Sequence, residues 1–416
     1  MVAILGYSRQ QIVAAVQGMY TAVADSPDSP FHFPVGSSAC RLLGYPPEQV
    51  AELPQSLVES FAGVGYPFRA KAVQPGDRVL DIGAGAGNDS LIASRLAGPR
   101  GHVIALDLTA AMTRKLKHTV TEAGVPNISV LQASAERLPL ADASIDSITS
   151  NGALNLVPDK RRAVAEMFRV LRPQGRLQLA DVVIRRPVSV DCHDDPRLWV
   201  ECVVGATVEE DLLALFHDAG FEDIHVLNTL DYFAHSPSDQ TREIAASFGA
   251  HSIELGMQRG QEAPSPMQQW LRRLDPRRWL AALHRRGLAG MATLLMALLT
   301  CYGTLAVVAM LPLLGLGLRV NEGAWATAIA LFVLLTLAAI AAGIRRHQSL
   351  GPTLAGTIAT GILLYTLFVD YHALVELAGF LLLAAATGWD LYRRRHQEAR
   401  VLGLKPSASS PNLAEH

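Results

Sequence analysis

The sequence predicts an α/β protein with a doubly wound, nucleotide-binding sheet, followed by an α-helical membrane domain of four spans. The first observation is that residues 79–87 contain an apolar run followed by a glycine-rich turn, and that a second apolar run ends at Asp107. This strand–loop–helix–strand order is typical of nucleotide-binding sheets. The second observation is that the last third of the chain is rich in apolar segments about long enough to cross ~30 Å of hydrocarbon.

The glycine-rich turn also indicates which class of nucleotide binds. Asp81 ends the first apolar run, and the glycines of the loop are Gly83, Gly85 and Gly87. Glycine lets the backbone turn tightly and approach a ligand. Asp107 ends the second predicted strand, where a carboxylate accepts hydrogen bonds from ribose hydroxyls. A dinucleotide fingerprint would have glycine in place of Asn88, and an acid directly before the loop disfavours a pyrophosphate. The pattern therefore indicates a nucleoside ligand without phosphate.

Composition limits the classes of partner and the cellular compartment that fit this chain. The chain has 416 residues, enough for two or three domains, and its formal net charge of −2 gives no global attraction to nucleic acid. Hydrophobic residues make up 50% of the chain, which is high for a soluble protein. The cysteines are Cys40, Cys192, Cys202 and Cys301. They form no C-x-x-C pair and no zinc-like spacing, so we expect free thiols in a reducing compartment.

Shifts in composition predict five parts of the chain. The expected parts are an N-terminal leader or cap (1–73), the sheet domain (74–233), a linker with a basic amphipathic segment (234–286), a transmembrane domain (287–392) and a tail (393–416). The leader contains a predicted helix at residues 10–23. The first part of the linker is rich in Ser, Pro and Gln, residues that are common in connections.

Four apolar segments form the predicted membrane domain. The expected spans are 288–311, 324–344, 350–369 and 373–391. They are apolar all round with charges at their ends, which disfavours a soluble helical bundle. Arginines cluster before the first span, after the second and after the fourth, while the other two turns carry few. The positive-inside rule then predicts a multi-pass protein of the cytoplasmic (inner) membrane, with both termini and the sheet domain in the cytoplasm.

The D-x-G-x-G-x-G string resembles motif I of the class I S-adenosylmethionine-dependent methyltransferases. Segments 134–139, 146–151 and 170–177 match later turns and strands of that family in the same order. The resemblance implies a Rossmann-like sheet and S-adenosyl-L-methionine as cofactor. It implies that Asp81 lies near the methionine ammonium and that the loop glycines make backbone contacts. Asp107 would hold the ribose, and Ala135 and Glu136 would flank the adenine.

Residues 32–233 are similar to the arsenite methyltransferase branch of that family. The S-N-x-x-x-N-L-x-x-D-K string at 150–160 and the C-x-x-G-A string at 202–206 carry this similarity. It implies methylation of arsenite for detoxification, with Asn151 beside the transferring methyl. In that branch three thiolates hold the soft As(III) ion. Here two of those positions are Val64 and Gly152, so Cys202 remains as the arsenic ligand and catalytic thiol.

A second thiol is needed if arsenite is the substrate, and Cys192, Cys40 or glutathione could supply it. The four-span tail is similar to the mercury-resistance membrane transporter family through the strings at 313–317 and 388–391. Two alternatives stay open. One is methylation of another small or lipid-soluble molecule in contact with the bilayer, with His193 or Asp181 as a base. The other is a metal-handling membrane protein whose methyltransferase-like domain only binds ligand.

Overall fold

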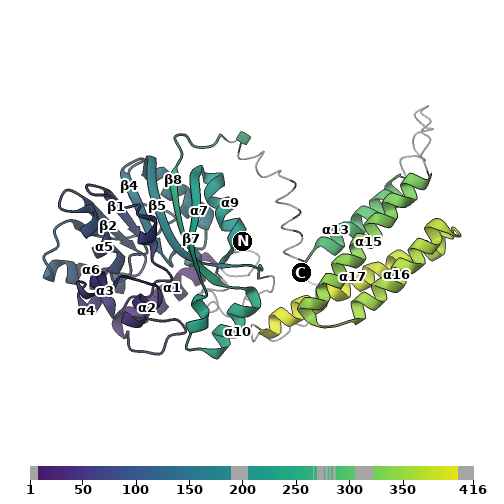
Figure 1. The fold of residues 1–416 in the computed structure, drawn as a ribbon, viewed down its shortest axis with the longest axis horizontal. Helices are drawn as coiled ribbons and strands as arrows, with labels where there is room; N and C mark the ends of the chain where they lie inside the picture. The colour runs from purple at the N-terminus through teal and green to yellow at the C-terminus, as the bar shows by residue number, and fades with distance from the viewer. Residues whose placement is uncertain are drawn as a thin grey trace, which may run out of the picture. The chain divides into compact units, whose positions relative to one another are not determined.

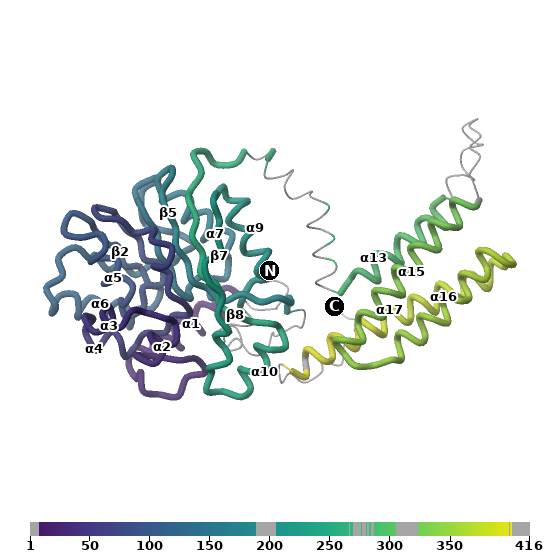
Figure 2. The backbone as a smooth tube through the Cα atoms, viewed as in Figure 1, coloured from purple at the N-terminus to yellow at the C-terminus, as the bar shows by residue number. Residues whose placement is uncertain are grey.

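The computed structural model describes residues 8–188, 205–265, 267, 268, 276, 280, 283, 287–304 and 322–401. The chain divides into two compact units, Met1–Arg272 and Arg273–His416. The first is an α/β unit and the second is helical (Figures 1 and 2). Each unit is described by itself.

In the described residues of the α/β unit, one sheet of eight strands has the continuous order β3-β2-β1-β4-β5-β8-β7, and β6 pairs with β5. The strands are β1 (Arg78–Ile82), β2 (His102–Asp107), β3 (Ile128–Gln132), β4 (Ile145–Asn151), β5 (Leu171–Ile184), β6 (Thr207–Val208), β7 (Phe221–Leu230) and β8 (His251–Arg259). Strands β1 to β5 pair in parallel, whereas β8 is antiparallel to both β5 and β7. The order reverses between β1 and β4, the point at which doubly wound sheets bind ligands. The predicted fold class is confirmed.

Helices connect and cover these strands (Figure 1). They are α1 (Arg9–Asp25), α2 (Ser37–Leu42), α3 (Pro47–Ala51), α4 (Gln55–Val58), η2 (Pro67–Ala70), α5 (Asn88–Ala97), α6 (Ala110–Glu122), η3 (Leu154–Leu156), α7 (Lys160–Val170), α9 (Glu209–Ala219), η4 (Tyr232–His235) and α10 (Asp239–Phe248). Aliphatic side chains of the central strands pack against α7 and α9, with Phe168, Phe216 and Phe221 stacked edge to face between them. This core holds the strand ends in fixed positions.

The sheet extends beyond residue 233, where the sequence was expected to leave the domain. Helix α10 and strand β8 follow that position, and β8 lies between β5 and β7. The polar residues of this segment obscured the strand. Glu254 of β8 is only 3% exposed, and its carboxylate binds Arg69 at 2.6 Å and the Tyr66 amide at 2.9 Å. The expected linker therefore contributes helix α10 and the interior strand β8, and the buried Glu254 of β8 holds the leader.

The leader packs onto the sheet domain as part of the same unit. A capping box between Ser8 and Gln11 begins α1, which extends the predicted helix at 10–23 by a residue or two at each end. The Gln17 side chain donates to the Leu108 carbonyl at 3.2 Å, and Lys115 donates to the Ala24 carbonyl at 2.9 Å. These bonds fix α1 beside the carboxyl end of β2.

The helical unit contains α13 (Ala289–Leu298), the π-helical turn η5 (Leu299–Gly303), α15 (Glu322–His347), α16 (Gly351–Phe368) and α17 (Ala373–Val401). Among the described residues, three helices are long and apolar enough to cross a membrane: Gly323–His347, Gly351–Phe368 and Ala373–Glu398. The expected first span begins with α13 and η5, and the rest of it lies outside the described residues. Large apolar side chains such as Leu374, which is 82% exposed, face outward, as lipid-facing residues do.

We expect Gly87→Ala to destabilise the α/β unit much more than Gly98→Ala. Both glycines have positive φ, at 107° and 69°, so alanine at either position should cost about 1–3 kcal/mol of backbone strain. A Cβ on Gly87 would also lie 2.1 Å from Cδ1 of the fully buried Leu116, whereas one on Gly98 meets nothing within 4 Å. This overpacking adds about 1–3 kcal/mol. Thermal unfolding of the full-length protein in detergent measures the difference, and equal midpoints for the two variants would contradict the packing.

Candidate functional site

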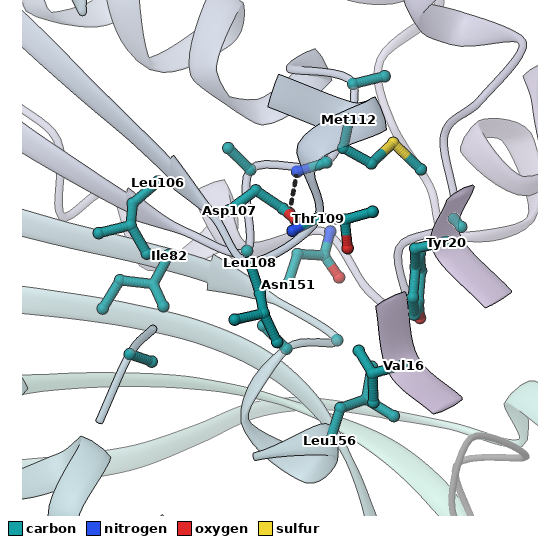
Figure 3. A pocket seen from close by; sticks show the side chains of 18 of the residues that line it. Val16, Tyr20, Ile82, Leu106, Asp107, Leu108, Thr109, Met112, Asn151 and Leu156 are labelled. Carbon is teal, nitrogen blue, oxygen red and sulfur yellow. Dashed lines mark hydrogen bonds between the residues drawn. The ribbon is translucent and has the colours of Figure 1, made fainter. Parts of the chain in front are cut away.

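A pocket opens at the carboxyl ends of β1, β2 and β4 and encloses about 1050 Å³, including the part open to solvent. Its wall combines α1, the leader segment 60–63, the glycine loop and the turns after β2, β3 and β4 (Figure 3). Most of the predicted site residues line it: Gly83, Gly85, Gly87, Asp107, Ala135, Glu136 and Asn151. The structure therefore brings together residues that are up to 68 positions apart, from Gly83 to Asn151.

The glycine loop has the conformation that only glycine adopts easily. The φ angles of its three glycines are 77°, 53° and 107°. The Gly83 and Ala84 amides both donate to the Leu106 carbonyl, at 2.8 and 3.0 Å, which ties the loop to β2. A Cβ on Gly83 would lie 2.3 Å from the Cβ of Ala153. The loop therefore lies against the turn after β4, and a side chain would force the two apart.

Asp107 is fixed by backbone donors. Its Oδ2 accepts from the Gly85 amide at 2.9 Å and its Oδ1 accepts from the Thr109 amide at 2.7 Å. Burial raises the pKa of this carboxyl. Figure 3 shows Asp107 and Thr109 on the pocket wall near Asn151. Each carboxylate oxygen keeps capacity for a further donor, which suits the two hydroxyls of a ribose.

Asp81 lies behind the loop and is not among the residues that line the pocket. It is 1% exposed, and its Oδ2 accepts from the Ser90 hydroxyl at 2.5 Å. Burial, together with the charge of Asp89, raises the pKa of Asp81 to about 8. Its predicted place beside the methionine ammonium is therefore not one that the pocket wall provides directly.

Asp89, which no sequence pattern indicated, lines the pocket from the first turn of α5. Its carboxylate accepts from the Tyr45 hydroxyl at 2.6 Å and from Nδ2 of Asn151 at 2.9 Å. Burial raises its pKa to about 6. An acid in the first turn of a helix is ordinary, so the sequence offered only its position, two residues after the glycine loop, as a signal.

These carboxylates share one electrostatic property. In the described part of the chain, no Lys, Arg or His side chain forms an ion pair with Asp81, Asp89 or Asp107. Beside them, Oδ1 of Asn88 is buried on the pocket wall without a hydrogen-bond partner. Buried negative charge and an unused acceptor fit a cationic ligand with hydrogen-bond donors. S-adenosylmethionine, a nucleoside with an ammonium and a sulfonium group, has this chemistry.

Asn151 connects the sheet to the leader. Its Oδ1 accepts from the amides of Val64 and Gly65 at 2.8 and 3.3 Å, and its Nδ2 donates to the Gly65 carbonyl at 2.9 Å. The side chain lines the pocket while it holds this segment at the end of β4. Its predicted place beside the transferring methyl stays a prediction.

Glu136 has a role that the sequence did not predict. Its carboxylate binds the guanidinium of Arg9 in α1 and accepts from the Asp159 amide at 2.8 Å. The side chain is only 3% exposed. Glu136 therefore attaches α1 across the pocket from the turn after β3, next to Ala135, and its contact with an adenine stays a prediction.

The structure also places the two positions at which thiols are expected and missing. A Cβ on Gly152 would lie 3.3 Å from Cγ1 of Val64, so these positions are neighbours, and Gly152 lines the pocket. Cys202, Cys192 and His193 lie outside the described residues. Cys40 is buried behind the wall, 3.8 Å from Nδ2 of Asn88. Burial raises its pKa to about 12, which keeps the thiol protonated.

Comparison with known proteins identifies the domains. Residues 74–220 match the family described as a methyltransferase domain. Over 184 residues the chain is 42% identical to a ubiquinone/menaquinone biosynthesis C-methyltransferase of Vibrio cholerae, covering 39% of this chain and 71% of that protein. The chain belongs to the class I S-adenosylmethionine-dependent methyltransferases. Residues 288–392 match the family of the MerC mercury resistance protein, and this methyltransferase is therefore a membrane protein.

Other similar proteins are named arsenite methyltransferases. The one from Halobacterium salinarum is 35% identical over 214 residues, covering 51% of this chain and 52% of that protein. The one from Mus musculus is 35% identical over 153 residues, covering 35% and 41%. The chain thus spans about half the length of these relatives. A solved arsenic(III) S-adenosylmethionine methyltransferase from Chlamydomonas reinhardtii has 28% identity and a TM-score of 0.45, covering 56% of this chain and 76% of that one.

The buried acids predict that the stability of the folded protein falls as the pH rises. The pKa values of Asp81 and Asp89 lie at about 8 and about 6, above the ordinary value of 3.8. Between about pH 4 and pH 8 the folded protein holds protons that the unfolded chain has lost, so stability falls as the pH rises through that window. A bound cation offsets this loss because it favours the ionised carboxylates.

We therefore expect saturating S-adenosylmethionine to raise the unfolding midpoint more at about pH 8.5 than at about pH 5.5. Thermal unfolding of the full-length protein in detergent measures both shifts. In Asp89→Asn the difference between the two pH values should shrink. A ligand-induced shift that is independent of pH in the unsubstituted protein would count against the electrostatic argument.

Proposed function

We propose that this membrane-anchored methyltransferase methylates arsenite or a related metalloid. The observation that carries the proposal is its 35% identity with the Halobacterium salinarum arsenite methyltransferase. The arsenite branch's S-N-x-x-x-N-L-x-x-D-K string adds support, because its second residue, Asn151, ends β4 on the pocket wall. Bound S-adenosylmethionine supplies an electrophilic methyl group on a sulfonium. The lone pair of As(III) can form the new bond to that methyl as the sulfur–methyl bond breaks, so no base is required.

The protein then has to align the acceptor and exclude water. Helix α1, held by Glu136, and the leader segment 60–63, which is followed by the residues that Asn151 holds, form one side of the pocket. Orientation of this kind can contribute about 7–11 kcal/mol to lowering a barrier. Cys202 would hold the metalloid with a second thiol. The protonated, buried Cys40 is a poor ligand, so Cys192 or glutathione is the better source.

If arsenite is the acceptor, Cys202→Ser should abolish its methylation and leave S-adenosylhomocysteine binding intact. Serine keeps the shape but is a hard, protonated ligand for a soft ion. Product formation from labelled S-adenosylmethionine and arsenite, with and without glutathione, measures the loss. Cys301→Ser, in the helical unit, is the control and should keep its activity. Full arsenite-methylating activity of Cys202→Ser would show that Cys202 does not hold the metalloid, whereas no product from arsenite with the unsubstituted protein would remove arsenite as the substrate.

A lipid-soluble acceptor is the second candidate, and the structure gives it a specific reason. Val64 and Gly152 provide an apolar contact where a metalloid site would have thiols, and the Vibrio cholerae relative is named for quinone biosynthesis. A carbon or oxygen nucleophile needs a base. Asp181, which the sequence suggests as a base, is 1% exposed, accepts from the amides of Asn155 and Val182, and is not among the residues that line the pocket. Labelled methyl transfer into a membrane lipid extract, with arsenite as the parallel assay, distinguishes the two.

We also propose that both termini and the methyltransferase unit face the cytoplasm. The described basic residues at the end of α15 and in the last part of α17 support this topology, because such residues stay on the cytoplasmic side. Reporter fusions after Val320 and Asp370 should be active outside the cytoplasm, and fusions after Gln348 and His416 should be active inside. An extracytoplasmic C-terminus would contradict the proposal.

A further inference from the structure

The pocket has a direction that follows from the order of the strands. The turn after β3 carries Ala135, at the expected adenine end, and the end of β2 carries Asp107, at the expected ribose. In the order β3-β2-β1-β4 the methionine part of the cofactor must therefore lie toward β1 and β4. Asp89 is at that end, because Nδ2 of Asn151, the last residue of β4, donates to it at 2.9 Å.

Asp89 is a buried carboxylate with neutral donors only. It is 5% exposed, and the bonds it accepts come from the Tyr45 hydroxyl and the Asn151 amide. Each oxygen thus takes one neutral donor and keeps further acceptor capacity. Among the described residues no basic side chain pairs with it. A buried carboxylate in this state gains most from a cationic donor.

Asn88 adds a second acceptor at the same place. It is 3% exposed and lines the pocket next to Asp89. Its Nδ2 faces Sγ of Cys40 at 3.8 Å, which leaves Oδ1 buried without a partner. A buried acceptor without a donor costs about 1–3 kcal/mol, so the pocket is completed by a ligand that donates hydrogen bonds there.

We propose that Asp89 and Asn88 bind the α-ammonium group of S-adenosylmethionine, the role that the sequence assigns to Asp81. An ammonium offers three donors and one positive charge, which match the free capacity of these two side chains. Asp81 accepts a hydrogen bond from Ser90 and does not line the pocket. It can therefore act on the ammonium through its negative charge but does not contact it. This inference rests on S-adenosylmethionine as the cofactor and is independent of the methyl acceptor.

The test compares two ligands that differ in the amino-acid part. S-adenosylhomocysteine carries the ammonium, whereas 5′-methylthioadenosine keeps the adenosine and lacks it. Calorimetric titration of the full-length protein in detergent should show that Asp89→Asn weakens S-adenosylhomocysteine about 10- to 100-fold. Asn88→Ala should weaken it less, in the same direction. Binding of 5′-methylthioadenosine should stay within about twofold in both variants, which also shows that the pocket is folded.

Matched variants separate the possible outcomes. Asp107→Asn should weaken both ligands, because it touches the shared ribose, and Asp81→Asn should affect S-adenosylhomocysteine less than Asp89→Asn does. Equal weakening of both ligands by Asp89→Asn would show that Asp89 only maintains the pocket and would overturn the inference. A selective loss in Asp81→Asn instead would also overturn it. Failure of the unsubstituted protein to bind S-adenosylhomocysteine would refute the cofactor itself, a different result.

Discussion

Buried negative charge without a counter-ion is the constraint on which the site depends. Asp81 and Asp89 are buried beside the glycine loop, and Asp107, at the end of β2, is partly buried on the pocket wall. Desolvation of a carboxylate is costly unless hydrogen bonds or cations offset it. Here neutral donors supply part of the compensation, through Ser90 and the backbone amides around Asp107. The negative charge that these donors leave uncompensated favours a cationic nucleoside over one that carries phosphate.

The leader is held by the same edge of the sheet. Three polar side chains of the sheet domain reach it: Glu136 holds α1, Asn151 holds the backbone at residues 64–65, and Glu254 holds Tyr66 and Arg69. Buried polar groups fix the position of the leader more specifically than an apolar face alone would, because each group must meet its own hydrogen-bond partner. The pocket wall is therefore formed by segments far apart in the chain, and closure over a cofactor depends on these bonds.

Some of the site that the sequence predicted is local. The glycine loop and Asp107 lie within a single strand–helix–strand unit, where spacing alone fixes the geometry. Asp89 and Glu136 depend on partners from distant segments, Tyr45 and Arg9, and no local pattern shows such pairs. Strand β8 was missed for a related reason, since a buried Glu254 reads as a surface residue until its partners are known. Val64 and Gly152 are far apart in the sequence, and only the fold shows that they are neighbours.

The described helices of the membrane unit are long and apolar enough to cross a bilayer. The central claim, however, concerns the charge of the pocket. Calorimetric titration of the full-length protein with S-adenosylmethionine, S-adenosylhomocysteine and NADH tests it most directly. Both S-adenosyl ligands should bind, and NADH, which brings a pyrophosphate to buried carboxylates, should not. Tight binding of NADH with no response to S-adenosylhomocysteine would contradict the account.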